Sequence, residues 1–400
     1  MKDKFSTTTQ LGLTRRGFLQ STAVAAGAAV LGTSFAETAQ AAASNVVRGY
    51  GVTTSQLKDW SIMQKSTGVS MEFTGTNNSV GVFLRDVVAS QLGDDADIFV
   101  FESGTEDVLG PQGIYLKIDE KHPELTLWDR TPDEWKRSET VVDKEGVQYG
   151  VPVIGNADSF GYYPDKMDAA SDGNDELSWS LMFDDEKTRG RVAYDQTWTY
   201  SIGVAALYLM GLGKIGVKDV ADMTGEEAAK VVNFLIERKK AGQFRTLHTA
   251  FEEQIQLLSS GTVDVINCWE PAVRETNKSL GSDKTRYAYT KEGYFKWGHG
   301  AYIAAQAEGR GNLDNIYKVL NYYLGGEYRA IQARDRGYAG PNMDLGVQYA
   351  KENGWSAEEI ENLSNTEKKV ARKFAKPYTS TTTPTNSDAI EEEWQRFLNA

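Results

Sequence analysis

The sequence GVPVIGN, residues 150–156, decides how this chain of 400 residues is organised. It is apolar and extended, has a glycine at each end, and separates two halves built from similar elements. A second stretch of this kind, residues 293–300, lies between a charged segment and the apolar run 301–305. Such stretches are typical of strands that cross between lobes, so we expect two lobes that the chain visits in turn.

Short apolar runs alternate with helical segments in both halves. The expected strands cover 45–50, 69–73, 97–101, 191–195 and 263–268. The expected helices cover 54–67, 80–92, 197–210, 224–242 and 249–261, the last two starting at the capping boxes Thr224/Glu227 and Thr249/Glu252. Continuous apolar runs such as 97–101 suit strands that helices cover on both faces. The alternation therefore predicts an α/β fold with mainly parallel sheets.

The first 43 residues are similar to an export signal. RRGFL at 15–19 precedes an alanine-rich apolar run over 21–36, and AQA at 39–41 offers a small-residue cleavage site. The paired arginines resemble the twin-arginine signal of bacteria, although Gln20 stands where that signal often has Lys. A run of about 16 weakly apolar residues is too short for a membrane anchor. We expect a signal peptide over 1–43, export through the twin-arginine translocase, and a mature protein in the periplasm.

Composition narrows the classes of partner. The formal net charge is −13, and removal of residues 1–43, which carry +2, makes it −15. An acidic surface of this kind repels nucleic acid and anionic membranes, so we expect no nucleic-acid partner. Acidity that simply keeps an exported protein soluble is an equally good explanation, so the charge does not identify a ligand.

Metal, cofactor and catalytic chemistry have little support in the sequence. Cys268 is the only cysteine and ends an apolar run, so we expect a buried, inert thiol. The three histidines, His122, His248 and His299, have no metal-ligand spacing. GLGKIG at 211–216 matches a dinucleotide fingerprint, but an expected helix precedes it, so we interpret it as a helix stop and loop. We expect no metal, no cofactor and no catalytic residue.

Aromatic and acidic residues gather at the ends of the expected strands and at the second crossing. They are Tyr50, Trp198, Trp269 and Trp297 among the aromatics, and Glu102, Asp195 and Glu270 among the acids. Ligands of open α/β sheets bind beyond the carboxyl ends of strands, so these residues are candidates for a pocket lining. A Trp face attracts a cation by about 0.5–2 kcal/mol, and a carboxylate would hold its charge. Core packing remains the alternative for any single Trp.

Five segments, in the correct order, resemble the periplasmic substrate-binding proteins of ABC importers, specifically the spermidine/putrescine-binding group. They are DIFVF with GIYLKID (97–119), YGVP to GYY (149–163), WSLMF to KTRGRV (179–192), the strand at 261–269, and GYAGPN (337–342). The likeness extends over nearly the whole mature chain. It implies a two-lobed fold of type II, in which each lobe is a mainly parallel sheet flanked by helices. Crossing strands join the lobes, which close on a ligand by a hinge motion.

The resemblance also implies a domain map and a site. Residues 44–152 form lobe 1, 153–292 lobe 2, 293–345 the return to lobe 1, and 346–400 a helical segment packing on lobe 2. Trp269 and Asp195 correspond to ligand-binding residues of the family, and the aligned loop of lobe 1 falls on Glu102 and Ser103. The full expected ligand-binding set is Tyr50, Thr53, Glu102, Ser103, Asn156, Asp195, Trp198, Trp269, Glu270, Trp297 and His299.

Departures from the family change the expected ligand. Trp198 stands near a position where polyamine binders carry a further acid, and His299 near one where they carry Asp. No Trp follows the N-terminal strand. Fewer acids and more aromatics disfavour a ligand with two or three separated ammonium groups. They favour a solute with one cationic centre, such as a quaternary ammonium compound, an amino acid derivative or another zwitterion.

We therefore expect a non-enzymatic, monomeric solute-binding component of an ABC importer, which delivers its ligand to a permease in the inner membrane. Two alternatives stay open. One is a periplasmic enzyme that is exported folded with a bound cofactor. The other is a chemosensory binding protein that signals through a receptor instead of a permease.

Overall fold

The computed structural model describes residues 45–76, 80–382 and 384–400. The expected signal peptide lies outside these residues. No helix among the described residues is long and apolar enough to cross a membrane.

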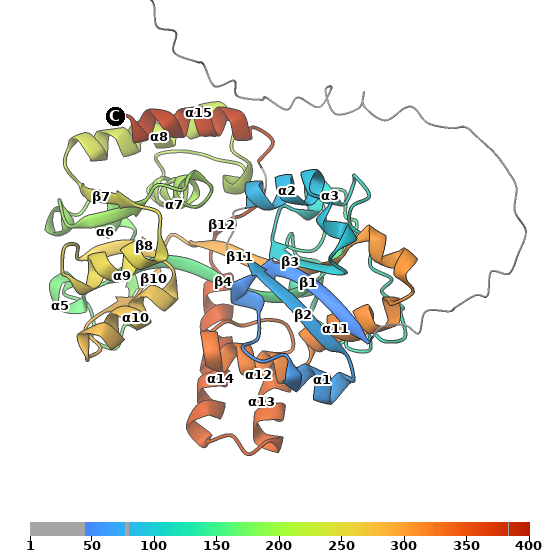
Figure 1. Ribbon diagram of the computed structural model, residues 1–400. Coiled ribbons are helices and arrows are strands. Elements are labelled where there is room, and N and C mark those ends of the chain that lie inside the picture. Colours follow the sequence, from blue (N-terminus) through green and yellow to red (C-terminus); the bar gives the residue numbers. More distant parts are fainter. Residues whose placement is uncertain (1–44, 77–79, 383) are drawn as a thin grey trace, which may run out of the picture. The chain divides into compact units, whose positions relative to one another are not determined.

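One ten-stranded sheet organises the described chain, with the strand order β2-β1-β3-β11-β4-β8-β6-β7 (Figure 1). These strands are β1 (Val46–Val52), β2 (Ser70–Thr76), β3 (Ile98–Glu102), β4 (Gly150–Tyr162), β6 (Val192–Asp195), β7 (Phe244–His248), β8 (Val265–Cys268) and β11 (Tyr294–Ile303). Beside this path, β12 (Tyr378–Ser380) pairs with β11, and β9 (Arg286–Tyr287) pairs with β4. A separate pair is formed by β5 (Glu176–Leu177) and β10 (Tyr289–Thr290).

Parallel pairing dominates at both ends of the sheet and antiparallel pairing at its centre. β1 is parallel to β2 and β3, and β6 is parallel to β7 and β8. The central strands β3, β11, β4 and β8 pair antiparallel in that order. The expected α/β fold is confirmed, with two parallel groups joined through β11 and β4.

β4 belongs to both groups of strands. Its residues from Gly150 to Asp158 pair with β11, and those from Ser159 to Tyr162 pair with β8. All 13 residues are buried, because strands and helices cover this long strand along its whole length. Both stretches expected to cross between the halves are thus strands of the sheet, and β4 continues beyond the expected 150–156.

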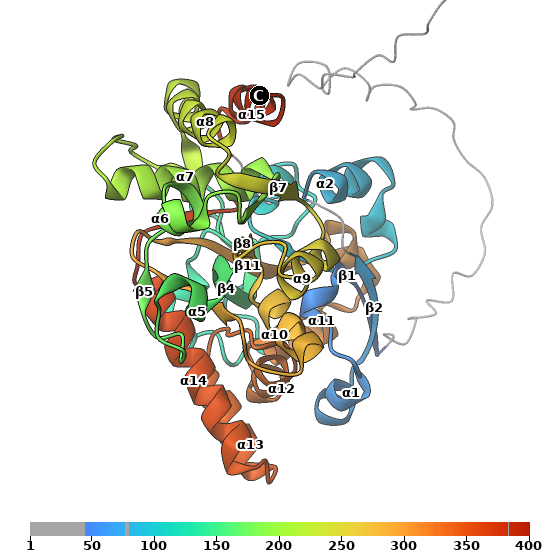
Figure 2. The ribbon, with the colours of Figure 1, turned by 90° about the vertical axis from the view of Figure 1, so that its left-hand side faces the viewer.

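Helices flank the sheet in Figures 1 and 2. In the first part of the chain they are α1 (Ser61–Thr67), α2 (Val80–Ala89), α3 (Glu106–Leu109) and α4 (Asp133–Lys136). After β4 they are α5 (Pro164–Met167), α6 (Ser180–Phe183), α7 (Trp198–Gly211), α8 (Gly225–Lys240), α9 (Phe251–Ser259) and α10 (Glu270–Leu280). After β11 they are α11 (Leu313–Leu324), α12 (Gly326–Arg336), α13 (Met343–Glu352), α14 (Ala357–Phe374) and α15 (Ser387–Leu398).

Separate apolar cores divide the sheet into two lobes. The first-lobe core includes Val47, Val151 and Tyr323, and the second-lobe core includes Trp179 and Val204. Trp297 of β11 packs against both cores. Burial of apolar surface stabilises each core by about 25 cal/mol per Å², and the crossing strands connect the two cores.

The C-terminal segment differs from the expectation that residues 346–400 pack on lobe 2. Helix α15 does contact α7 and α8, and Trp394 Nε1 donates to the carbonyl of Gln196 at 2.8 Å. Helix α14 instead packs its apolar face on α12 and α13, as Figure 1 shows, although its Lys369 and Lys373 also pair with Glu270 of α10 in the second lobe. The reason is an apolar cluster in which Leu363 and Val370 of α14 pack with residues of α12 and α13, including Ala330.

Two helix starts also differ from the expectation. The helix expected from Thr54 begins at Ser61, after a short 3-10 turn over Thr53–Ser55. The capping box at Thr224 and Glu227 is confirmed. At α9, however, Glu253 and not Glu252 reaches back, and its Oε2 accepts from the backbone N–H groups of Thr249 and Ala250. The run GLGKIG at 211–216 begins at the last residue of α7, as expected for a helix stop.

At Gly51, strand β1 approaches β3 so closely that a substitution there tests their pairing. A Cβ at this position would lie 2.2 Å from the carbonyl oxygen of Val100, a backbone atom that cannot move aside cheaply. We expect Gly51→Ala to lower the free energy of unfolding by about 1–3 kcal/mol, measured by urea denaturation. Gly81→Ala is the matched control, since a Cβ on this α2 residue has no atom within 4 Å. Equal stability of both variants would contradict this register.

Candidate ligand-binding site

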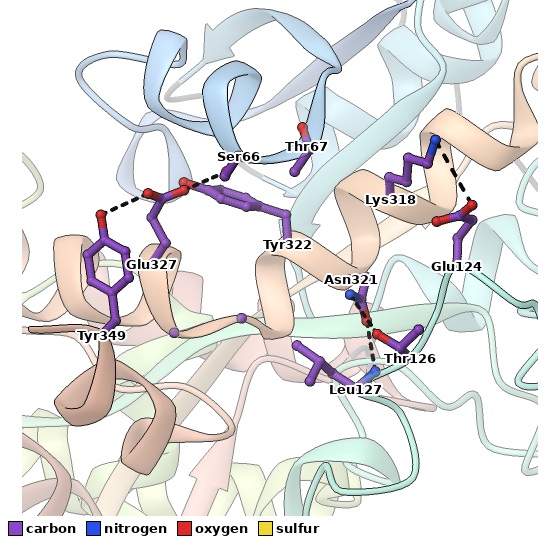
Figure 3. A pocket seen from close by; sticks show the side chains of 12 residues that line it. Ser66, Thr67, Glu124, Thr126, Leu127, Lys318, Asn321, Tyr322, Glu327 and Tyr349 are labelled. Atoms are coloured by element: carbon purple, nitrogen blue, oxygen red, sulfur yellow. Dashed lines mark hydrogen bonds and ion pairs between the residues drawn. The ribbon is translucent and has the colours of Figure 1, made fainter. Parts of the chain in front are cut away.

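A cavity of about 470 Å³ in the first lobe contains none of the expected ligand residues. It lies among α1, α11, α12, α13 and the loop before α4 (Figure 3). Its acids already have partners in the cavity wall. Glu327 accepts from the hydroxyls of Ser66 at 2.7 Å and Tyr349 at 2.8 Å, and Glu124 faces Lys318 at 4.0 Å. The cavity is therefore separate from the site sought here.

The crossing strands bring four expected residues together. Asn156 of β4 stands opposite Trp297 of β11, and Glu102 of β3 stands opposite His299. The rings of Trp297 and His299 have centroids 5.1 Å apart, and the Tyr338 ring meets Trp297 edge-on at 5.1 Å. Residues directly opposite each other across a sheet share a face, so these side chains form one group.

His299 and Glu102 have different charge states within this group. His299 is 2 % exposed, its Nδ1 lies 2.7 Å from Ser55 Oγ, and burial lowers its pKa to about 3. The imidazole is therefore neutral and does not replace a charged ligand residue. Glu102 is half-buried, and burial raises its pKa to about 7. A nearby cation would stabilise the ionised form of Glu102, since desolvation disfavours it.

Three further expected residues, Ser103, Tyr50 and Thr53, lie in the first lobe. Ser103 is buried, and its hydroxyl lies 3.1 Å from Thr140 Oγ1. Tyr50 stacks on Phe83 with ring centroids 6.1 Å apart. Thr53 begins the 3-10 turn that follows β1. Ser103 and Tyr50 thus each contact a first-lobe side chain, and Thr53 lies in the turn after β1.

The second lobe supplies another group of expected residues at strand ends. Asp195 ends β6 beside His248 of β7, and its Oδ1 accepts from the N–H of Thr197 at 2.7 Å. Burial raises the pKa of Asp195 and lowers that of His248, so low-dielectric surroundings favour the neutral forms. Trp198 begins α7 and packs against the second-lobe core. The Tyr200 hydroxyl of α7 donates to the carbonyl of Ser159 in β4 at 2.9 Å, which links this group to the crossing strand.

Trp269 has the most exposed ring of the expected set. It is 43 % exposed and stacks on Phe251 with centroids 5.8 Å apart and an interplanar angle of 24°. The backbone N–H of Trp269 donates to Gln254 Oε1 at 3.2 Å. The stacked pair presents an apolar, electron-rich surface at the carboxyl end of β8.

Glu270, another expected ligand residue, is ion-paired within the protein. Its carboxylate lies 2.6 Å from Lys369 Nζ and 3.2 Å from Lys373 Nζ, both of α14. Although burial alone would raise it, the ammonium groups of Lys373 and Lys369 hold the pKa of Glu270 well below its usual range. Two ammonium groups therefore already balance the charge of this carboxylate in the structure.

Asp158 is the functional candidate that the sequence reasoning missed. It is 1 % exposed, accepts from Trp297 Nε1 at 2.9 Å, and lies 3.2 Å from the Tyr287 hydroxyl. Burial raises its pKa to about 7, although Lys373 opposes this shift. The sequence did carry a signal for Asp158, because it is an acid within the mostly apolar run that forms β4. A carboxyl group that is buried in a strand must have polar partners, so its position indicates a specific contact.

The burial of a neutral His299 predicts that the free energy of unfolding falls in acid. Between pH 6.5 and about 3 the unfolded chain binds a proton at this residue and the folded protein does not. Its contribution is therefore fully present above pH 6.5 and is lost as the pH falls toward 3. At pH 5 the loss is about 2 kcal/mol. We expect His299→Gln, compared with wild type at pH 8 and pH 5 by urea unfolding, to have a smaller pH-dependent loss. An unchanged difference between the two pH values would contradict a neutral, buried His299.

Solved structures of known proteins share this fold at low sequence identity. PotD, the spermidine/putrescine substrate-binding protein of Streptococcus pneumoniae, matches with a TM-score of 0.65 and 13% identity, over 88% of this chain and 98% of PotD. A spermidine/putrescine ABC transporter protein of Listeria monocytogenes matches at 0.61 and 15%, over 89% and 99% of the two chains. An ABC transporter substrate-binding protein of Bradyrhizobium japonicum matches with a TM-score of 0.61 and 18% identity, over 88% of this chain and 99% of that protein. The two-lobed fold of periplasmic binding proteins is confirmed.

Sequence comparison assigns the family. No curated protein matches the chain. The family model described as bacterial extracellular solute-binding protein matches residues 60–357, which is most of the described chain. The chain belongs to the bacterial extracellular solute-binding protein family, whose members bind small solutes for ABC transporters.

Proposed function

We propose that this protein is exported to the periplasm by the twin-arginine route and captures a small solute with one cationic centre between its lobes. As a monomer and without catalysis, it then delivers the solute to an ABC permease. The observation that carries the proposal is the position of Trp297, which lies on a crossing strand and packs against the cores of both lobes. A ligand that contacts this ring would touch the junction about which the lobes move.

The charges around the junction support a single cationic centre. Glu102 and Asp195 both have pKa values raised by burial, so a ligand cation would stabilise their ionised forms. Glu270, the third expected acid, is already paired with two lysines. The proposed site therefore has fewer available carboxylates than the sequence pattern indicated, which disfavours a long polyamine.

Polar groups at the junction support a ligand that also carries a hydrogen-bonding group. Asn156 is 1 % exposed and its Oδ1 has no hydrogen-bond partner in the structure. The Asn156 backbone stands opposite Trp297. Among proteins with this fold, one solved structure is a GABA receptor and another is MotA of A. tumefaciens B6 in complex with glucopine. The fold thus serves amine-containing solutes other than polyamines.

A thermal-shift screen followed by calorimetry tests the ligand class. The probes are choline, glycine betaine, GABA, putrescine and spermidine. We expect a ligand with one cationic centre to bind with 1:1 stoichiometry. At 100 times its Kd it should stabilise the protein by about 2.7 kcal/mol, because it binds only the folded state. Tight binding of spermidine would contradict the single cationic centre, and turnover of any probe would contradict the absence of catalysis.

Trp269 tests where the ligand binds. We expect Trp269→Ala to weaken binding of the best probe by about 2- to 30-fold, since the ring offers an exposed face for a cation worth about 0.5–2 kcal/mol. Trp355→Ala is the matched control, because Trp355 is partly buried in the hairpin of α13 and α14 and faces Arg334 at 4.4 Å. Calorimetry on both variants measures the difference. Equal affinities would place the ligand away from the end of β8.

A further inference from the structure

Asp158 occupies the exact junction between the lobes. It is the last residue of β4 that pairs with β11, opposite Phe295. The next residue, Ser159, is the first that pairs with β8, opposite Cys268. A change in the hydrogen bonds of Asp158 therefore acts where the two lobes meet.

The carboxylate of Asp158 joins three strands through its two oxygens. Oδ2 accepts from Trp297 Nε1 of β11 at 2.9 Å, and Oδ1 lies 3.2 Å from the Tyr287 hydroxyl of β9. The same hydroxyl lies 2.8 Å from the carbonyl of Cys268 and accepts from the N–H of Ser159 at 2.7 Å. The side chain of one β4 residue is thus connected to β8, β9 and β11.

The protonation of Asp158 selects between two hydrogen-bond patterns, because Tyr287 has one phenolic hydrogen. When Tyr287 donates to the Cys268 carbonyl, a protonated Asp158 can donate to the Tyr287 oxygen. When Asp158 is ionised, both of its oxygens only accept, and the hydrogen of Tyr287 is drawn to the carboxylate. In that state the indole N–H of Trp297 makes a charge-assisted bond, which is stronger than a neutral one.

The charged groups around Asp158 nearly balance each other. Lys373 of α14 donates to the carbonyl of Ala157 at 3.0 Å and pairs with Glu270 of α10, so its attraction for Asp158 is opposed by Glu270. Lys369 of α14 also pairs with Glu270. The other titratable neighbours are Tyr287 of β9, Cys268 of β8, Tyr200 of α7 and Tyr338, whose pKa values burial raises. These four groups are uncharged near pH 7, where the pKa of Asp158 lies.

We propose that Asp158 is a positioning residue of the ligand site, which fixes the Trp297 indole at the lobe junction and sets its attraction for the ligand's cation. The inference rests on the proposed function for its ligand, but the link between Asp158 and Trp297 does not. An ionised carboxylate on the indole N–H holds the ring in one orientation and increases the negative potential of its face. Ligand affinity then rises as Asp158 loses its proton, and binding of a cation releases that proton.

The first experiment needs no ligand and follows intrinsic tryptophan fluorescence from pH 5 to pH 9. We expect wild type to show a transition near pH 7 and Asp158→Asn to lack it, while Asn still offers an oxygen to Trp297 Nε1. Trp297→Phe should also abolish the transition. Glu102→Gln is the control, because the pKa of Glu102 also lies near 7 but its titration is not the proposed cause. A transition that persists in Asp158→Asn, or that Glu102→Gln abolishes, would overturn the proposal.

A second variant tests the same network if Asp158→Asn does not fold. Tyr287→Phe leaves Asp158 in place but removes a hydroxyl that favours its ionised form. We expect the fluorescence transition of this variant to persist and to move to higher pH. A transition at the wild-type pH would count against the network, and circular dichroism at pH 7 checks that each variant is folded.

The third measurement uses choline as the probe and compares its Kd at pH 6 and pH 8 by calorimetry. Because Glu102 also titrates near pH 7 and would add its own pH dependence, the comparison is made in the Glu102→Gln background. There we expect choline to bind up to about tenfold more tightly at pH 8, and the added Asp158→Asn substitution to make its Kd equal at both pH values. A pH-independent Kd in the Glu102→Gln background would overturn the inference. If choline does not bind at all, the ligand is not a simple quaternary ammonium cation, and the fluorescence transition alone supports or overturns the role of Asp158.

Discussion

The antiparallel pairing of β4 with β11 is the constraint on which the rest of the structure depends. Buried backbone N–H and C=O groups must be paired, and the 13 buried residues of β4 can satisfy theirs only within a sheet. β4 achieves this by exchanging one partner strand for another at Asp158. Because the sheet continues through this exchange, two lobes with separate cores remain connected.

That constraint also explains why polar chemistry concentrates at the junction. A strand that changes partners leaves a position where neither lobe's apolar core fully closes. Asn156, Asp158 and His299 occupy this position, and each is nearly inaccessible to water. Asp158 accepts from the Trp297 indole, and the His299 ring lies 5.1 Å from that of Trp297, so both titratable residues contact the same aromatic side chain. The proposed ligand site and the proposed protonation-sensitive contact of Asp158 therefore lie in the same part of the protein.

The α/β fold and the two crossing strands could be predicted from the sequence because they depend on local patterns. Apolar runs such as 97–101 and 150–156 form buried strands wherever helices cover them, and Thr224 caps its helix through Glu227 only three residues away. The position of helix α14 was predicted less accurately from the sequence. Its amphipathic pattern shows that one face must be buried but does not say which lobe buries it, and Ala330 of α12 provides that surface.

The sequence by itself determined the layered architecture, the buried thiol position of Cys268 and the gathering of aromatic rings at strand ends. Only the tertiary structure decided which carboxylates are available. Glu270 is paired with lysines about a hundred positions away, and Asp158 meets an indole 139 positions away. Local patterns carry no information about such partners, because hydrogen bonds and ion pairs depend on distances that exist only after the strands have aligned.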